Sequence, residues 1–230
     1  FDYYNENYEE LWKEIENIIL FWADKGVEIF RIDNPHTKPF PFWEWLIADV
    51  KEKRPELVFL AEAFTRPKMM HRLAKSGFDM SYTYFAWRSA KWEFEQYLKE
   101  LTQSDAKEYM RGIFFPTTPD IFPKYHAYKG ANAFKQRYFL AATLSSLTGM
   151  YNGYELCENI PSPIKEELAD SEKYQYKVHN WSGPGIQDFV RRLNVARQEH
   201  VALQEYDNLD FHYAQRSRSE ERRVGKECRS

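Results

Sequence analysis

Two short apolar stretches that each end in a carboxylate constrain the fold of this chain most strongly. Residues 27–32 are mainly β-branched and aromatic and lie between turn-forming residues. This composition is typical of a buried strand in a parallel sheet. Asp33 follows that strand directly, and Glu62 follows a second apolar stretch, residues 57–61, in the same way. Enzymes with α/β barrels carry their chemistry at these carboxyl ends of the strands.

The two carboxylates favour one kind of chemistry. The ends of neighbouring parallel strands lie about 5 Å apart. Glycosidases that act with retention hold their nucleophile and their acid/base carboxyl roughly 5 to 5.5 Å apart. The pair therefore predicts sugar chemistry with retention. In the alternative interpretations, Asp33 caps a turn before Pro35 and Glu62 is a surface residue that begins a loop.

Strands and amphipathic helices are expected to alternate along the chain. Strands are predicted at residues 27–32, 57–61, 79–84, 113–115 and 149–151. Helices are predicted at residues 8–24, 42–50, 67–76, 90–101, 131–145 and 186–199. Alternation of this kind predicts a parallel sheet with right-handed crossovers. About five strands are three fewer than an eight-stranded barrel requires.

The first expected helix has a start signal and an apolar stripe. Asn7, with Glu10 three residues later, resembles a capping box. Helical spacing predicts a buried face that consists of Leu11, Ile15, Ile18, Ile19 and Trp22.

Residues 153–184 form a long segment rich in turn residues. Such loops in compact domains are usually functional or disordered.

Composition excludes several classes of protein. An apolar fraction of 43% with 29% charged residues describes a globular chain, and no apolar run is long enough to span a membrane. The net charge of -3 argues against a nucleic-acid partner, because basic residues cluster only in the last residues of the chain. The histidines and carboxylates show no spacing typical of metal ligands. Aromatic residues make up 17% of the chain, which suits sugar stacking and core packing alike.

Several motifs resemble those of a known family. Residues 30–39 (FRIDNPHTKP) and 59–67 (FLAEAFTRP) resemble the α-amylase superfamily, and more closely the α-1,4-glucan:maltose-1-phosphate maltosyltransferases. Residues 153–159 (GYELCEN) and 170–175 (DSEKYQ) are similar to further motifs of that family. The resemblance extends along nearly the whole chain, up to about Tyr213.

The resemblance implies a particular fold and domain organisation. It implies an α/β fold, a partial (β/α)8 TIM barrel that consists of about strands 4 to 8 with their helices. Residues 1–213 would be the C-terminal part of this catalytic barrel and residues 214–230 a tail. Residues 218–230 resemble a translated sequencing adapter, so we expect them to be non-native and disordered, and we expect the chain to be a gene fragment. Without that tail Cys157 is the one remaining cysteine, which fits a reducing cytoplasm.

The resemblance also implies roles for three carboxylates. Asp33 would be the nucleophile, Glu62 the general acid and base, and Asp120 the stabiliser of the transition state. Asp120 departs from the family pattern in one neighbour, because the chain has Thr117-Thr118-Pro119-Asp120 where Asn-Thr-Pro-Asp is usual. A role for Pro119-Asp120 as a plain turn is the alternative.

Five further residues are implied to bind substrate. They are Arg31, Asn34, His36, Lys173 and Tyr174. Arg31 lies two residues before Asp33, on the same face of the strand, and can keep it ionised. Asn34 would contact the phosphate of the donor, and His36 would face the acceptor sugar. The alternatives are a plain Asn34-Pro35 turn and, for Lys173 and Tyr174, an ordinary loop surface.

The implied function is a transferase of α-glucan (glycogen) biosynthesis. It would move maltosyl units from maltose 1-phosphate to the non-reducing end of an α-1,4-glucan with release of phosphate, and it needs no metal and no other cofactor. The resemblance implies that the whole protein is a cytoplasmic homodimer without a membrane or nucleic-acid partner. We expect this fragment alone to be inactive. An α-amylase-type hydrolase and a non-catalytic glucan-binding protein are the alternatives.

Overall fold

The computed structural model describes residues 2–169, 172–173 and 175–212. Its strands are β1 Ile29–Asp33, β2 Val58–Glu62, β3 Met80–Tyr82, β4 Gly112–Phe114 and β5 Leu147–Thr148. Its α-helices are α1 Tyr8–Asp24, α2 Phe40–Lys53, α3 Pro67–Ala74, α4 Lys91–Gln103, α5 Tyr125–Thr143 and α6 Gln187–Glu199. Its 3-10 helices are η1 Pro35–Thr37, η2 Tyr84–Trp87, η3 Asp105–Glu108, η4 Tyr154–Leu156 and η5 Val201–Leu203.

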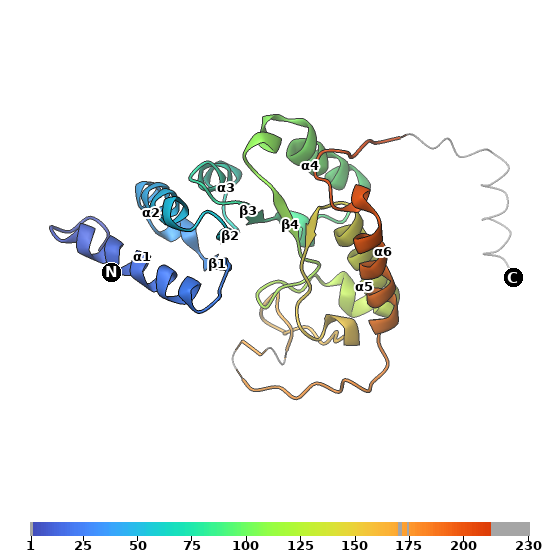
Figure 1. Cartoon of the computed structure of the whole chain (residues 1–230). Helices are drawn as coiled ribbons and strands as arrows, with labels where there is room; N and C mark the ends of the chain where they lie inside the picture. The colour runs from blue at the N-terminus through green and yellow to red at the C-terminus, as the bar shows by residue number, and fades with distance from the viewer. Residues whose placement is uncertain (1, 170–171, 174, 213–230) are drawn as a thin grey trace, which may run out of the picture.

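The strands form one parallel sheet in the order β1-β2-β3-β4-β5. Each strand is followed by one or more helices, so the crossovers place helices on one face of the sheet. Figure 1 shows α1, α2 and α3 beside β1 and β2, and α5 and α6 at the opposite end of the sheet. The arrangement confirms the prediction of a partial α/β barrel.

Strand alternation assigns the side chains to two faces. On the helix-covered face, Phe30 of β1 stacks on Phe59 of β2 with ring centroids 5.9 Å apart, and Phe59 is fully buried beneath α2. On the other face, Arg31 and Asp33 of β1 stand opposite Leu60 and Glu62 of β2. Because strand side chains alternate with a period of two, Arg31, Asp33 and Glu62 all lie on this second face of the sheet.

Some predicted element boundaries are wrong. The fifth strand is Leu147–Thr148 and not residues 149–151, because only the earlier pair lies in register with Ile113 and Phe114. Helix α5 begins at Tyr125, before the predicted start, and contains a kink at Gly130, whose φ of 59° is not helical. Gly130 interrupts the apolar pattern, so the sequence pattern predicted a helix only after it and missed the turns from Tyr125 to Gly130.

The expected capping box and buried face of α1 are also wrong in part. Asn7 makes no side-chain capping hydrogen bond. Ile19 is buried, whereas Ile18 and Trp22 are 49% and 51% exposed. Helix α1 packs on α2, and Ile18 and Trp22 lie on a side of α1 that is exposed in the described part of the chain. No described helix is long and apolar enough to cross a bilayer.

Candidate active site

Asp33 and Glu62 end neighbouring strands at the same level. They are the last paired positions of β1 and β2, so their side chains project side by side from the carboxyl end of the sheet. The Asp33 side chain is 67% exposed, whereas that of Glu62 is 8% exposed. One carboxylate is therefore open to an incoming molecule, and the other is largely removed from water.

Arg31 connects the two carboxylates. Its Nη1 lies 3.7 Å from Oδ2 of Asp33, and its Nη2 lies 3.4 Å from Oε1 of Glu62. The guanidinium also lies over the ring of Tyr82 in β3, 5.9 Å from the ring centroid. A planar cation in this position holds the two carboxylates close together and partly offsets their mutual repulsion.

A close-packed aromatic layer supports the guanidinium. Tyr82 stacks on Phe115 with ring centroids 4.8 Å apart and an interplanar angle of 8°. Phe115 in turn covers Gly149, where an added Cβ would overlap its ring. Tyr82 and Phe115 escaped sequence reasoning because they are far apart in the chain, and only the strand register shows that they share the concave face.

Asn34 links the two strand ends through its backbone. It adopts the left-handed conformation, with φ 46° and ψ 51°, which asparagine tolerates better than most residues. Its N–H donates to the backbone oxygen of Glu62 at 3.1 Å and to Oε2 of Glu62 at 3.4 Å. The indole N–H of Trp43 donates to the Pro35 carbonyl at 2.8 Å and fixes the loop that follows.

The surroundings of Glu62 favour its protonated form more than water does. Burial raises the pKa of Glu62 above its ordinary value, and the Asp33 and Asp120 carboxylates act in the same direction. Arg31 and the Asn34 N–H lower the pKa, because both stabilise the ionised form. A carboxyl with a raised pKa next to an exposed carboxylate is the arrangement that separates the roles of acid and nucleophile.

Asp120 approaches from the loop after β4. Its backbone N–H donates to Oγ1 of Thr118 at 3.2 Å, within a turn closed by backbone hydrogen bonds between Thr118 and Ile121. Its carboxylate pairs with the ammonium of Lys173, which also lies 3.3 Å from Oε1 of Glu167. Glu167 was not predicted, because an isolated loop glutamate carries no pattern in the sequence.

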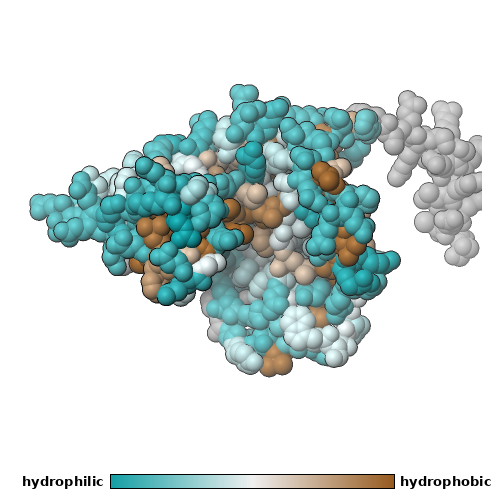
Figure 2. All heavy atoms as spheres, viewed as in Figure 1, coloured by the Kyte–Doolittle hydropathy of each residue, from teal (hydrophilic) through white to brown (hydrophobic). Residues whose placement is uncertain are grey.

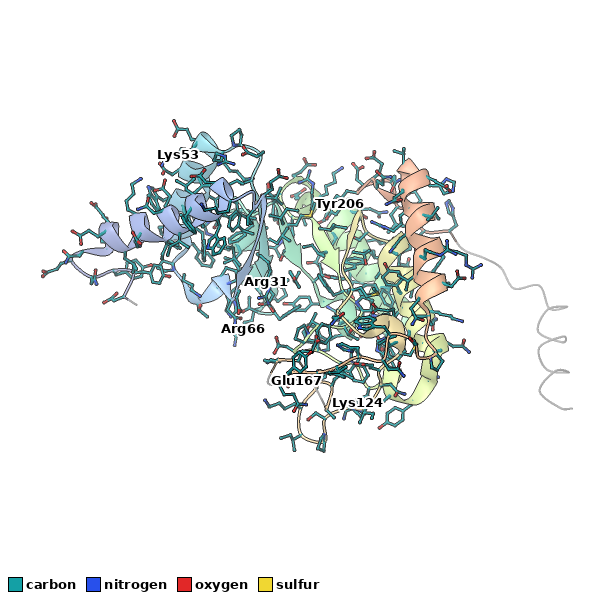
Figure 3. All side chains as sticks on the ribbon, turned by 60° about the horizontal axis from the view of Figure 1, so that its bottom comes forward. Arg31, Lys53, Arg66, Lys124, Glu167 and Tyr206 are labelled. Carbon is teal, nitrogen blue, oxygen red and sulfur yellow. The ribbon has the colours of Figure 1, made fainter. Side chains whose placement is uncertain are left out.

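The remaining predicted binding residues lie in different places. His36 is in η1, three residues after Asp33, and its buried Nδ1 has no hydrogen-bond partner among the described residues. Lys173 is on the loop after β5 and pairs with Asp120. Tyr174 lies outside the described residues. Figure 3 shows Arg31 and Arg66 on the part that carries β1 and β2, and Lys124 and Glu167 on the part across from it. No described group of His, Cys, Asp and Glu is arranged to hold a metal ion.

His179 bridges two glutamates and so holds the long loop after β5 in place. The Nδ1 of His179 lies 2.8 Å from Oε1 of Glu158, and its Nε2 lies 2.8 Å from Oε1 of Glu172. Hydrogen bonds to Glu158 and then to Glu172 raise the pKa of His179, against the effect of burial. The residue next to Glu172 is Lys173, so this histidine anchors the loop that reaches Asp120.

Solved structures identify the fold. An α-amylase from Anoxybacillus superimposes with a TM-score of 0.71 at 14% sequence identity and covers 87% of this chain and 46% of its own. An α-amylase from H. orenii superimposes with a TM-score of 0.67 at 18% identity and covers 88% of this chain and 49% of its own. The fold is therefore that of part of an α-amylase-type barrel.

Sequence comparison is more specific. The chain is 50% identical over 213 residues to an α-1,4-glucan:maltose-1-phosphate maltosyltransferase of Cereibacter sphaeroides. The match covers 92% of this chain and 36% of the relative. The chain is 52% identical over 212 residues to the enzyme of that name from Myxococcus xanthus. That match covers 92% of this chain and 32% of the relative. The expected resemblance to these maltosyltransferases is confirmed. The chain spans about a third of the length of the curated relatives it matches. No family model matches the chain.

Proposed function

We propose that the whole protein is a retaining α-1,4-glucan:maltose-1-phosphate maltosyltransferase of α-glucan biosynthesis. The observation that carries the proposal is the pairing of Asp33 with Glu62 at the ends of adjacent strands, with Arg31 between them. The resemblance to maltosyltransferases supplies the substrates, maltose 1-phosphate as donor and an α-1,4-glucan as acceptor.

In the first step, the Asp33 carboxylate attacks the anomeric carbon of the donor. The bond from that carbon to the phosphate oxygen breaks, and Glu62 gives its proton to the departing phosphate. The raised pKa of Glu62 favours the protonated form that this step requires. A covalent maltosyl ester on Asp33 results, and Asp120 stabilises the positive charge that develops on the sugar ring.

In the second step, the acceptor hydroxyl gives its proton to Glu62 and attacks the same carbon. The ester bond to Asp33 breaks, and the two inversions together retain the configuration. Asn34 is proposed to contact the donor phosphate, His36 the acceptor sugar, and Lys173 and Tyr174 the donor sugar. We further propose that the whole protein is a cytoplasmic homodimer, as the resemblance implies.

Phosphate release tests the proposal in the protein expressed from its complete gene. Release from maltose 1-phosphate is measured with and without maltoheptaose, in the wild type and in Asp33→Asn. We expect release that depends on the acceptor and that is lost in Asp33→Asn, because the amide cannot form the ester. Cleavage of maltoheptaose without phosphate release would instead establish a hydrolase, and binding without either reaction would establish a non-catalytic glucan-binding protein.

A further inference from the structure

A stack of four groups crosses the sheet beside the candidate carboxylates. Arg31 belongs to β1 and Tyr82 to β3, while Phe115 directly follows β4 and Gly149 directly follows β5. The Arg31 guanidinium lies 5.9 Å from the centroid of the Tyr82 ring, and the rings of Tyr82 and Phe115 are parallel within 8°, with centroids 4.8 Å apart. Because β3 lies between β2 and β4, the guanidinium and the Phe115 ring approach Tyr82 from opposite sides. Each group therefore contacts the next one in the order of the strands.

Gly149 closes the stack at the end opposite Arg31. A Cβ added at this residue would lie 2.0 to 2.5 Å from three atoms of the Phe115 ring, which is far closer than packed atoms approach. The Gly149 N–H donates to the carbonyl of Phe114 at 3.0 Å, so pairing with β4 fixes its backbone. Its φ lies outside the left-handed region. The Phe115 ring, and not the backbone conformation, therefore requires a glycine there.

Tyr82 has little room to move aside. Phe64 packs edge-on against its ring, with centroids 6.0 Å apart and an interplanar angle of 88°. Burial raises the pKa of Tyr82, whereas the charge of Arg31 lowers it, and the hydroxyl is neutral at physiological pH. The negative face of a neutral ring attracts a guanidinium. Because close-packed side chains transmit strain, a displacement of Phe115 should reach Arg31 through this ring.

The position of Arg31 matters because of the charges that face Glu62. Burial has the largest effect on the pKa of Glu62 and raises it, and the carboxylates of Asp33 and Asp120 raise it further. The Arg31 charge and the Asn34 N–H lower it. Arg31 is therefore the cation that opposes burial, from a distance of 3.4 Å between its Nη2 and Oε1 of Glu62. If the guanidinium moves away, the ionised form of Glu62 loses stabilisation.

We propose that Gly149 is a positioning residue, which holds the Arg31 guanidinium between the two carboxylates through the two stacked rings. The absence of a side chain at residue 149 leaves the space in which both rings lie parallel and the guanidinium reaches Glu62. The inference rests on the proposed function for the role of Glu62 as the acid. It adds a residue that acts on this acid through three successive contacts.

The experiment follows the acid in the whole protein. The value of kcat/KM for phosphate release from maltose 1-phosphate is measured against pH in the wild type, Gly149→Ala, Arg31→Met and the double variant. We expect Gly149→Ala to move the alkaline limb to higher pH by up to about one unit, because a neighbouring charge shifts a carboxyl pKa by about one to three units. In the Arg31→Met background the same substitution should cause no further shift.

Gly183→Ala is the matched control. Gly183 also has a φ outside the left-handed region, and the atom nearest to an added Cβ is the Asn180 carbonyl oxygen, at 3.1 Å. The alkaline limb should stay in place in this variant. An unshifted limb in folded Gly149→Ala would overturn the proposal, and so would equal shifts in the presence and absence of Arg31.

Two further variants decide if Gly149→Ala does not fold, as judged by its melting curve. Tyr82→Leu removes the ring from the stack and should move the limb to higher pH. Tyr82→Phe keeps the ring and should leave the limb in place. A limb that moves equally in both variants would assign the effect to the Tyr82 hydroxyl and contradict the stack.

The titration of Glu62 can also be followed without turnover. For each variant, Tm is compared with that of the same variant carrying Glu62→Gln, across the pH range. Because the folded-state pKa of Glu62 is raised, the stabilising effect of Glu62 relative to glutamine falls as the pH increases towards that value. In Gly149→Ala this fall should extend to higher pH. Such an extension without any phosphate release would retain the role of Gly149 and refute the proposed function, whereas phosphate release with an unchanged titration would do the reverse.

Discussion

Arg31 opposes the effect of burial on Glu62, the carboxyl that we propose as the acid. Arg31 contacts Glu62 at 3.4 Å and opposes the rise that burial causes in the pKa of Glu62. The same cation lies between the acid and the exposed Asp33 carboxylate, so it affects both partners in the proposed reaction. The alkaline limb of the pH–rate profile reports the acid that must be protonated.

Replacement of Arg31 by methionine should move that limb. Without the cation, the ionised form of Glu62 loses a stabilising charge, so its pKa rises further and the alkaline limb shifts to higher pH, although the maximal rate falls. The measurement is kcat/KM against pH in the whole protein. Arg66→Met is the control, because Arg66 is an exposed arginine of the next loop. A limb that stays in place, or that moves to lower pH, would contradict the assigned electrostatics.

The positions of the two candidate carboxylates, at the ends of adjacent strands, were predictable from the sequence. Asp33 and Glu62 were predicted because apolar runs stop at each of them, and the register places them together. Tyr82, Phe115 and Glu167 were not predicted. Their roles depend on which side chains meet across the sheet or across loops, and neither periodicity nor composition contains that information.

At the scale of elements, the loop after β5 is held by charge more than by apolar packing. His179 lies between Glu158 and Glu172, and the amide of Asn152 donates to Glu172 at 3.1 and 3.2 Å. Lys177 lies 2.6 Å from Glu158 and is the other cation of the cluster. Both ring nitrogens of His179 face carboxylates, so the full set of hydrogen bonds requires the imidazolium form.

The anchoring of this loop should therefore depend on pH. His179 has a folded-state pKa raised above 6.5, so its stabilising effect is fully present below pH 6.5 and is lost as the pH rises through the folded value. Limited proteolysis of residues 158–179 in the whole protein should accelerate as the pH increases from 6 to 9. His179→Gln should be cleaved rapidly at every pH, and its rates correct for the pH dependence of the protease. Equal rates in the two proteins at pH 6 would refute the anchor.

The elements themselves were predicted unevenly. Long amphipathic helices such as α1 and α2 have strong periodicity, and their positions agree with the structure. The short strand β5 was misplaced by two residues, because its identity depends on pairing with β4 and not on its own composition. The kink at Gly130 was missed for a similar reason, since a helix that continues through a non-helical glycine needs tertiary support.

At the scale of the molecule, the sheet is open in the described part of the chain. β1 and β5 are its edges, and exposed apolar side chains lie near the β1 edge, among them Ile29, Phe21 and Trp22. Figure 2 shows hydrophobic residues in the hollow between the part that carries α1 to α3 and the part that carries α5 and α6. Unpaired edges with apolar neighbours favour association between chains.

The 230-residue chain expressed alone should thus aggregate and be inactive. Light scattering after size-exclusion chromatography measures the first property, and phosphate release from maltose 1-phosphate the second. The whole protein is the control for both. A monodisperse 230-residue chain with acceptor-dependent activity would contradict the expectation. Residues 213–230, which include the predicted tail, lie outside the described residues.

The pairing of Asp33 with Glu62 has a consequence for how the protein could be monitored while it folds. A slip of one residue between β1 and β2 would send one of the two carboxylates to the helix-covered face, because side chains alternate strictly along a strand. A slipped sheet can still be compact and rich in secondary structure, yet it would not form the maltosyl ester that we propose on Asp33. Trapping of that ester therefore counts correctly aligned molecules, and it would distinguish them from misaligned ones that circular dichroism records as folded.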